Sequence, residues 1–367
     1  MLKYILVNKM NETKKKKVVV GLSGGVDSSV CALLLKQAGF DVIGVTMILY
    51  DKKSEDKACG SSKAVLDAKA VADKLEIPFY TLDLTKEFKE LVIDYFAKEY
   101  MAGKTPNPCI ACNKHLKFNL MLKKAMELYD ADYIATGHYA KVLKDENTNR
   151  YYVAESVTAS KDQTYVLYNM TQEELSHVLM PLGDYTKDEI REIARENGFI
   201  TADKKDSQEI CFVEDNDYAN FIATNYNYKS IPGEFVDTKG NKYGKHKGII
   251  HYTVGQRRGL GLSLKSPLYV KRVDNKTHEV ILCPKEELFT DSLICSDVNL
   301  MALDKLDTPI KASVKIRYSA PKAAATLIPL ENGDIKVVFD EPARAVTPGQ
   351  AVVFYDENKV LGGGIIQ

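Results

Sequence analysis

The sequence has neither an excess of charge nor a long apolar run. Lys and Arg together number 50, Asp and Glu together also number 50, and the formal net charge at pH 7 is zero. This balance does not indicate a nucleic-acid partner, but it does not exclude one either, because binding needs only a local basic face. No apolar stretch approaches the roughly 18 residues of a membrane helix. The first residues also lack the charged start and long apolar stretch of a signal peptide. We therefore expect no membrane partner.

Cysteine is also scarce. The chain has seven cysteines, and most of them are isolated in the sequence. An odd number without pairing fits a reducing cytoplasm better than a disulfide framework, so we expect a cytoplasmic protein. The exception is "TPNPCIACNKHLKF", where Cys109 and Cys112 form a C-x-x-C pair. There is no second C-x-x-C and no suitably spaced histidine pair, so the other half of a zinc site is missing.

The order of apolar segments predicts the fold class. Short runs such as "KKVVVGL", "DVIGVTMIL" and "DYIATG" alternate with stretches of helical periodicity. This alternation predicts βαβ units and a parallel sheet with helices on both faces. Short alternating strands follow from about Phe212, and strands alone from about Glu286, which indicates a small barrel. The expected parts are an N-terminal extension (1–14), an α/β domain (15–215), a small mostly-β central domain (216–285) and a C-terminal β-barrel domain (286–367).

Two local expectations concern segments near the candidate site. Residues 171–200 read as helical, with Thr186 opening a capping pattern ahead of Glu189. The C-x-x-C pair is expected in a loop that precedes the helix of "FNLMLKKAMELYD".

The segment "GLSGGVDSSV", which starts at Gly21, lies between the first expected strand and the first expected helix. Glycines there let the backbone approach a phosphate, and the helix directs its unpaired N–H groups and positive dipole end at the anion. Ser23 and Ser28 can add hydroxyl donors. Asp27 is unusual in an anion site unless it holds Mg²⁺ or orients another group. The loop lacks the Gly-Lys-Ser/Thr of a Walker A motif, so it has no lysine of its own for a phosphate.

The S-G-G-x-D-S of this loop resembles the PP-loop of the ATP pyrophosphatases. Further motifs occur in the order "TPNPCIACNKHLKF", "ATGHYA", "KDQTYVL", "SQEICFV", "YTVGQRRGLG" and "IRYSAP". Together they resemble the bacterial tRNA 2-thiouridylase family over essentially the whole chain from about Lys15. The resemblance implies a PP-loop catalytic domain of the adenine nucleotide alpha hydrolase type, a central tRNA-binding domain and a C-terminal barrel.

The resemblance also implies a reaction. The enzyme would use ATP and Mg²⁺ to adenylate the C2 oxygen of the wobble uridine in Lys, Glu and Gln tRNAs, and sulfur would then replace that oxygen. A cysteine desulfurase or a sulfur carrier protein would supply the sulfur. Two other functions are weighed against this one. They are a PP-loop amide ligase for a small molecule, which needs no placed cysteines, and an RNA-binding module with an inactive nucleotide loop.

The family's functional residues map onto this chain by motif. The implied ATP contacts are Gly21, Leu22, Ser23, Gly24, Gly25, Val26, Asp27, Ser28, Met47 and Gly137. The implied tRNA contacts are Asn107, His138, Lys161, Asp162, Gln163, Arg317, Tyr318 and Gln350. Arginine and lysine can neutralise phosphates, and tyrosine can stack on a base.

The resemblance makes Cys211 the persulfide carrier and Cys112 its partner thiol. Cys109 stands where many family members have an aspartate, so it is a candidate catalytic residue without an assigned role. Three interpretations remain open at this stage. In the first, Cys109 has no role, and Cys112 and Cys211 form the thiol pair. In the second, all three thiolates bind a [4Fe–4S] cluster. In the third, the C-x-x-C pair Cys109 and Cys112 is half of a zinc site. The remaining cysteines are expected to be structural or loop residues, namely Cys31, Cys59, Cys283 and Cys295.

Overall fold

The structure is a computed structural model that describes residues 15–50, 61–204, 210–213 and 217–367. The expected N-terminal extension and Cys59 lie outside the described residues. The chain divides into two compact units. The first comprises Met1–Val92, Cys109–Phe212 and Asn358–Val360, and the second Ile93–Pro108, Val213–Glu357 and Leu361–Gln367. Within the described ranges, none of the helices has both the length and the apolar character that a bilayer span requires.

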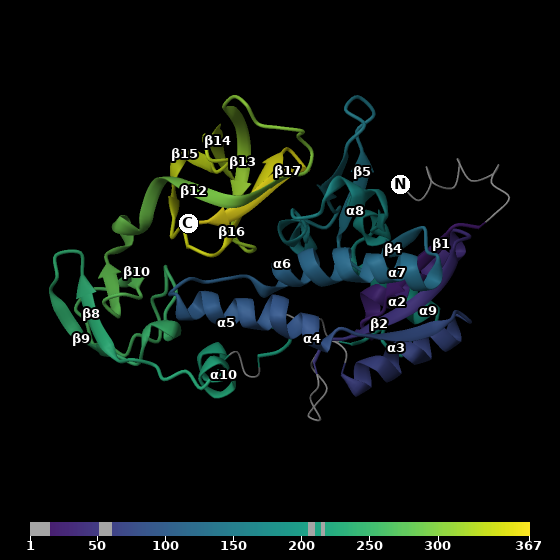
Figure 1. Ribbon diagram of the computed structural model, residues 1–367, viewed down its shortest axis with the longest axis horizontal. Helices are drawn as coiled ribbons and strands as arrows, with labels where there is room; N and C mark the ends of the chain where they lie inside the picture. The colour runs from purple at the N-terminus through teal and green to yellow at the C-terminus, as the bar shows by residue number, and fades with distance from the viewer. Residues whose placement is uncertain (1–14, 51–60, 205–209, 214–216) are drawn as a thin grey trace. The chain divides into compact units, whose positions relative to one another are not determined.

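The first unit is built on a parallel sheet with the strand order β3-β2-β1-β4-β7 (Figure 1). The central strand β1 pairs in parallel with β2 on one side and with β4 on the other. Its three valines, Val18 to Val20, are buried, as expected of a parallel strand covered on both faces. The predicted α/β sheet is therefore confirmed. The strands are β1 (Lys17–Gly21), β2 (Asp41–Ile48), β3 (Phe79–Asp83), β4 (Tyr133–Ala135) and β7 (Val178–Leu179).

Three helices of this unit share a buried cluster with β1. Leu34 of α2, Val71 of α3 and Ile190 of α9 all belong to it. The Thr186 hydroxyl accepts a hydrogen bond from the Glu189 N–H, and the Glu189 side chain accepts one from the Thr186 N–H. This capping box confirms the predicted start of α9. The helices are α2 (Val26–Gln37), α3 (Ser62–Lys74) and α9 (Lys187–Glu196).

The expectation of helix throughout residues 171–200 is wrong. This stretch contains α8 (Gln172–Ser176), the strand β7, the 3₁₀ turn η5 (Pro181–Asp184) and then α9. Val178 and Leu179 pair in parallel with Ile134 and Ala135 of β4. The backbone of β4 has hydrogen-bonding groups on the side away from β1, and these apolar residues pair with them. Pro181 cannot continue a helix, because its ring clashes with the preceding turn.

The expectation of a loop at the C-x-x-C pair is also wrong. Cys109 and Cys112 lie in α6 (Pro108–Cys112), which continues into the π-helical segment η2 (Asn113–Leu120) and then α7 (Met121–Tyr129). Pro108 is the first residue of α6. Proline suits that position, because its fixed φ is helical and its missing N–H would have no partner within the helix. π-helical segments are rare and occur often at functional sites.

The other elements of the first unit flank these helices and strands. β5 (Ala140–Lys144) and β6 (Tyr151–Glu155) form an antiparallel hairpin. Lys359, one of the C-terminal residues that group with this unit, pairs with Ala154 of β6. The remaining helical segments are α4 (Thr85–Phe88), η1 (Lys89–Ile93), η3 (Ala159–Lys161) and η4 (Thr164–Val166).

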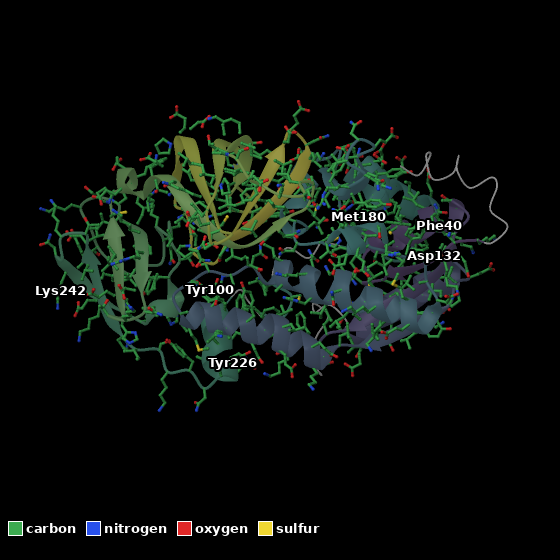
Figure 2. All side chains as sticks on the ribbon, turned by 45° about the horizontal axis from the view of Figure 1, so that its top comes forward. Phe40, Tyr100, Asp132, Met180, Tyr226 and Lys242 are labelled. Carbon is green, nitrogen blue, oxygen red and sulfur yellow. The ribbon has the colours of Figure 1, made fainter. Side chains whose placement is uncertain are left out.

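The described part of the second unit includes the α-helices α5 and α10 and a four-stranded sheet. The hydroxyl of Tyr226, at the end of α10, donates a hydrogen bond to Asp94 of α5 at 2.5 Å. The sheet has the order β10-β11-β8-β9, which makes β9 an edge strand, and Lys242 lies on it (Figure 2). The elements are α5 (Asp94–Met101), α10 (Tyr218–Asn225), β8 (Gly233–Asp237), β9 (Lys242–His246), η7 (Ile249–His251), β10 (Tyr269–Asp274), β11 (Glu279–Cys283) and η8 (Lys285–Leu288).

The C-terminal strands close into a barrel, as predicted. The strand order is β12-β15-β14-β13-β16-β17, and β12 pairs with both β15 and β17, so the sheet returns to its first strand. Closure removes the exposed edges that an open sheet would have. The strands are β12 (Phe289–Leu300), β13 (Ile310–Lys315), β14 (Ala323–Pro329), β15 (Ile335–Arg344), β16 (Ala351–Asp356) and β17 (Lys359–Ile366).

Candidate active site

The glycine-rich loop connects the end of β1 to the start of α2 in the first unit. The Ser23 N–H donates to Ser28 Oγ at 3.1 Å, and the two serine hydroxyl oxygens lie 3.2 Å apart. Gly25 precedes α2 in an extended conformation. A glycine cannot cap the helix with a side chain, so the N–H groups of the first turn depend on other acceptors. A phosphate is an acceptor suited to that position.

Two glycines are required by the close packing around this loop. Gly24 has φ +70°, and a Cβ built on it would lie 2.5 Å from the carbonyl oxygen of Ala64 in α3. Gly137, which follows β4, would place a Cβ 2.7 Å from the Ser28 nitrogen. The backbones of the loop, of α3 and of the segment after β4 are therefore in direct contact. Larger residues at either position would displace the loop.

The side chains of Leu22 and Val26 are buried, with 2% and 3% of their surface exposed. Within the loop they can reach a nucleotide through backbone atoms only. Met47 is half-buried near the carboxyl end of β2, two residues past Val45, which pairs with Gly21. Carboxyl ends of parallel strands are where open α/β sheets bind ligands. The implied ATP contacts of the first unit therefore lie at the carboxyl ends of its parallel strands.

Asp27 lies in the first turn of α2, and the fold surrounds it with donors. The hydroxyl of Tyr139 donates to Asp27 Oδ1 at 2.7 Å. The ammonium of Lys187, the first residue of α9, donates to Asp27 Oδ1 at 2.8 Å and to Oδ2 at 2.9 Å. The structure shows this carboxylate hydrogen-bonded to Tyr139 and Lys187, and its role toward ATP stays a prediction. Both of its oxygens are engaged by side chains of the protein.

A second lysine, Lys204, connects the loop to the residues that follow α9. Lys204 Nζ donates to the Gly24 carbonyl at 2.9 Å and lies 2.8 Å from Asp67 Oδ2 of α3. The hydroxyl of Thr201 lies 3.2 Å from that of Ser29. The described residues that follow α9, up to Lys204, are therefore hydrogen-bonded to the glycine-rich loop and to the first turn of α2.

The three candidate catalytic cysteines differ in exposure. Cys109 is exposed, Cys112 is buried and Cys211 is half-buried. Phe212, the neighbour of Cys211, packs edge-to-face on Phe88 with ring centroids 5.7 Å apart. In the part of the chain that the structure describes, no three His, Cys, Asp or Glu side chains are grouped so that they could hold a metal ion. The cysteines as placed here therefore do not fit the cluster or the zinc interpretation.

The remaining described cysteines lie in the core, as predicted. Cys31, Cys283 and Cys295 are fully buried. Burial, with the nearby Asp27 charge, raises the pKa of the Cys31 thiol far above its ordinary value. Burial raises the pKa of Cys295 to about 12. Since only a thiolate is a good nucleophile, these thiols are unsuited to sulfur chemistry.

Family models and curated relatives cover nearly the whole chain. Residues 16–215 match the family model described as tRNA methyl transferase HUP domain. Residues 219–284 match the model described as tRNA methyl transferase PRC-barrel domain. Residues 290–366 match the model described as aminomethyltransferase beta-barrel domain. A protein named tRNA-specific 2-thiouridylase MnmA from Acetivibrio thermocellus is 54% identical over 358 residues, which is 96% of this chain and 99% of that protein. A protein of the same name from Clostridium beijerinckii is 55% identical over 357 residues, with the same coverage of both chains. The chain belongs to the tRNA 2-thiouridylase family.

One solved structure with partial similarity is a 4-thiouridine synthetase–RNA complex with bound ATP. It shares 21% identity and a TM-score of 0.37, over 54% of this chain and 45% of that chain.

Among the tRNA contacts that the thiouridylase family implies, His138 is buried rather than exposed. Its Nδ1 lies 2.7 Å from the Thr136 hydroxyl, and its ring packs 5.7 Å from that of Phe118 in η2. Burial, with a smaller effect of the Lys117 charge, lowers the pKa of His138 well below its ordinary value. Burial thus favours the neutral form of the imidazole. Its predicted contact with tRNA is not tested by these observations.

The "KDQ" segment supports the loop that contains Tyr139. The Tyr139 N–H donates to Gln163 Oε1 at 2.8 Å, and the Gln163 N–H donates to the Tyr139 carbonyl at 3.0 Å. Asp162 is buried and accepts from Thr164 and from the Ser156 N–H. Burial outweighs these hydrogen bonds and raises the pKa of its carboxyl group. Lys161 is half-buried at the end of η3. Contacts of these three residues with tRNA stay predictions.

The other implied tRNA contacts lie in the second unit. Arg317 Nη2 donates to the carbonyls of Val254 at 2.8 Å and Ala345 at 2.9 Å, so the guanidinium connects the "YTVGQRRGLG" segment to the barrel. Gln350 Nε2 donates to the Thr105 carbonyl at 2.8 Å. Asn107 is half-buried, and Tyr318 is 44% exposed. Of these four residues, Tyr318 presents the most surface for stacking on a base.

Sequence reasoning missed Tyr139, Lys187, Thr201 and Lys204 as residues of the site. Tyr139 belongs to the quoted "ATGHYA" motif and follows two residues that were identified. Lys187 directly follows the capping residue Thr186, and a lysine in a first helical turn gives no signal of a partner 160 residues away. Only the fold brings these side chains to the loop.

Proposed function

We propose that this chain is an ATP-dependent tRNA-uridine 2-sulfurtransferase. It replaces the C2 oxygen of the wobble uridine in Lys, Glu and Gln tRNAs with sulfur, and AMP and diphosphate are released. The observation that carries this proposal is the attachment of residues 201–204, which precede Cys211 in the sequence, to the phosphate loop and α2, through Lys204 to Gly24 and through Thr201 to Ser29. A chain that runs from contacts with a nucleotide loop toward a candidate persulfide cysteine suits a reaction in which ATP activates a group that sulfur then displaces. Membership of the thiouridylase family supports the same substrate class.

The first step makes the oxygen a leaving group. The uridine C2 oxygen attacks the α-phosphorus of ATP, an oxygen–phosphorus bond forms, and diphosphate departs with the electrons of the broken α–β bond. The negative charge that develops lies over the helix terminus and serines of the phosphate loop. An amide-like oxygen leaves poorly by itself, whereas the adenylated oxygen leaves as AMP.

The second step transfers sulfur. The terminal sulfur of a persulfide on Cys211 attacks C2, and AMP departs with the former C2 oxygen. The Cys112 thiolate then attacks Cys211 Sγ, and the terminal sulfur stays on C2 with the electron pair of the broken S–S bond. The two cysteines end as a disulfide, which a dithiol reductant must reduce. A desulfurase or a sulfur carrier protein reloads the persulfide on Cys211.

Mg²⁺ fits this site as a companion of ATP rather than as a resident metal. The carboxylate of Asp27 is engaged by Lys187 and Tyr139. Mg²⁺ commonly binds through one or two carboxylates together with substrate phosphates and water. The phosphates of ATP would therefore provide most of its ligands. Cys109, Cys112 and Cys211 as described do not form a ligand group for a [4Fe–4S] cluster, so the sulfur is carried as a persulfide.

The domain assignment and location are parts of the same proposal. Residues 15–215 form the ATP-binding catalytic domain, 216–285 the central tRNA-binding domain and 286–367 the C-terminal barrel domain. The Met47 side chain contacts the adenosine. The cysteine usage of the chain fits the cytoplasm.

The test follows nucleotide products and sulfur in one reaction. The protein, loaded with sulfur by a desulfurase, is incubated with ATP and an unmodified Lys tRNA transcript. AMP, diphosphate and thiolated tRNA are quantified, the last by retardation in a gel that contains an organomercury compound. The expected result is one AMP per thiolated tRNA, with no thiolation by Cys112→Ser or Cys211→Ser. AMP formation that does not need tRNA would indicate a small-molecule ligase. Binding of tRNA without any AMP formation would indicate an inactive RNA-binding module.

A further inference from the structure

The ion pair between Lys187 and Asp27 is unusual in its burial and its position. Lys187 is only 9% exposed, and lysine is almost never buried to this degree unless it is paired. Its ammonium is hydrogen-bonded to both oxygens of Asp27 and lies 5.7 Å from the ring centroid of Tyr139. Asp27 is in the first turn of the helix that follows the glycine-rich loop. The pair is therefore located where the phosphates of a bound nucleotide would lie.

The charge balance of the loop gives this pair a function. A triphosphate brings about four negative charges, and Asp27 without a partner would repel them. In a Walker A loop, a lysine of the loop itself supplies positive charge to the phosphates. The glycine-rich loop of this chain lacks such a lysine. A buried ammonium beside the first turn of α2 supplies the missing positive charge from another part of the chain. Tyr139 and Asp27 together restrict where that ammonium can lie.

We propose that Lys187 is the phosphate-binding lysine of this site, with Asp27 and Tyr139 as the residues that position it. Its ammonium contacts the diphosphate portion of ATP and stabilises the charge that accumulates there as the α–β bond breaks. The inference rests on the proposed function, because it assigns Lys187 to the nucleotide of that reaction. It predicts a selective effect on ligands that contain a β-phosphate.

The test measures binding of ATP, inorganic diphosphate and AMP by isothermal titration calorimetry, so it does not depend on turnover. Charge-assisted hydrogen bonds are among the stronger polar contacts, so Lys187→Met should weaken ATP and diphosphate binding about 10- to 100-fold. AMP binding should change less than about twofold, since AMP lacks the β-phosphate. Lys187→Arg should recover part of the loss because it keeps the positive charge. Lys69→Met is the matched control, because Lys69 is an exposed lysine of α3 that pairs with Asp73.

A double variant separates phosphate contact from neutralisation of Asp27. Lys187→Met leaves a partly buried carboxylate without its counter-ion, which can itself weaken anion binding or stability. Asp27→Asn with Lys187→Gln removes both charges and keeps side chains that can hydrogen-bond. If Lys187 contacts the diphosphate, this double variant still binds diphosphate poorly. Diphosphate binding restored to the wild-type value would overturn the inference.

Two further results would overturn it. One is a Lys187→Met protein that binds diphosphate as tightly as the wild type. The other is an equal loss of AMP, ATP and diphosphate binding together with a lowered unfolding temperature, which would identify the pair as a structural link between α2 and α9. Failure of the proposed function is distinguishable, because it would appear as a wild-type protein that binds ATP but does not thiolate tRNA.

Discussion

Gly24→Ala tests whether the phosphate loop depends on contact with α3. Gly24 has φ +70°, and an added Cβ would lie 2.5 Å from the Ala64 oxygen and 2.9 Å from the Ala64 Cα. Both of these are backbone atoms, so no side-chain rotation can relieve the overlap. The Gly24 carbonyl also accepts the hydrogen bond from Lys204. We therefore expect alanine to push the loop off α3 and to weaken that hydrogen bond.

The magnitude follows from comparison with Gly39→Ala. Gly39 also has a positive φ, +84°, but nothing lies within 4 Å of its built Cβ. Both variants therefore bear the cost of a left-handed backbone, about 1–2 kcal/mol. Only Gly24→Ala adds overpacking, which costs about 1–3 kcal/mol. Since 1 kcal/mol shifts the unfolding temperature by about 2–4 °C in a unit of roughly 200 residues, Gly24→Ala should unfold about 2–12 °C below Gly39→Ala.

The assay combines thermal unfolding by circular dichroism with calorimetric ATP binding. Gly24→Ala should unfold at the lower temperature and also bind ATP more weakly, because its loop is displaced. Gly39→Ala should bind ATP like the wild type, because Gly39 lies at the other end of α2. Equal unfolding temperatures for the two variants, with unchanged ATP binding in both, would refute the packing described for the loop.

Three further predictions concern neighbouring residues. Gly137→Ala should weaken ATP binding about tenfold or more, because its Cβ would lie 2.7 Å from the Ser28 nitrogen and 2.8 Å from the Asp27 carbonyl carbon; unchanged binding by calorimetry would contradict this. Burial lowers the pKa of His138, so the unfolded chain takes up its proton first and stability should fall as the pH drops below about 6.5. Between pH 6.5 and 5.5 this single group should contribute about 1 kcal/mol of that fall, which His138→Gln should remove from urea unfolding curves measured at both pH values. Protein purified without oxygen should contain no stoichiometric iron, and Cys109→Ser should keep thiolation; about four irons per chain that are lost with this substitution would instead establish a cluster.

Short-range features of the fold could be predicted from the sequence. The run from β1 through the glycine-rich loop into α2 is contiguous, and glycine and serine specify such a turn locally. The capping box of α9 lies within four residues, Thr186 to Glu189, and was found correctly. The secondary-structure predictions were wrong where contacts between residues distant in sequence override the local sequence pattern. β7 lies in a stretch of helical periodicity, but its two apolar residues pair with the edge of β4.

The positions of the candidate site residues were predictable only in part. The motifs identify the phosphate loop, Gly137 and the cysteines as residues, but not their surroundings. Contacts with RNA were predicted for His138 and Asp162 and stay predictions, but the structure buries both side chains. Their sequence neighbours do not reveal this burial, because it arises from packing against η2 and from turns around η4.

The sequence by itself determined the class of the protein. Its strand–loop–helix order, its phosphate loop and its spaced cysteine motifs indicate an α/β nucleotide-binding enzyme with thiol chemistry, and these are all patterns within short stretches of chain. Only the tertiary structure decided which side chains contact Asp27. Lys187 reaches it across 160 residues, and Lys204 reaches Gly24 across 180. Contacts at such separations depend on which helices and strands pack together, so no local pattern encodes them. The lysine that is absent from the loop sequence is supplied to the loop by the fold.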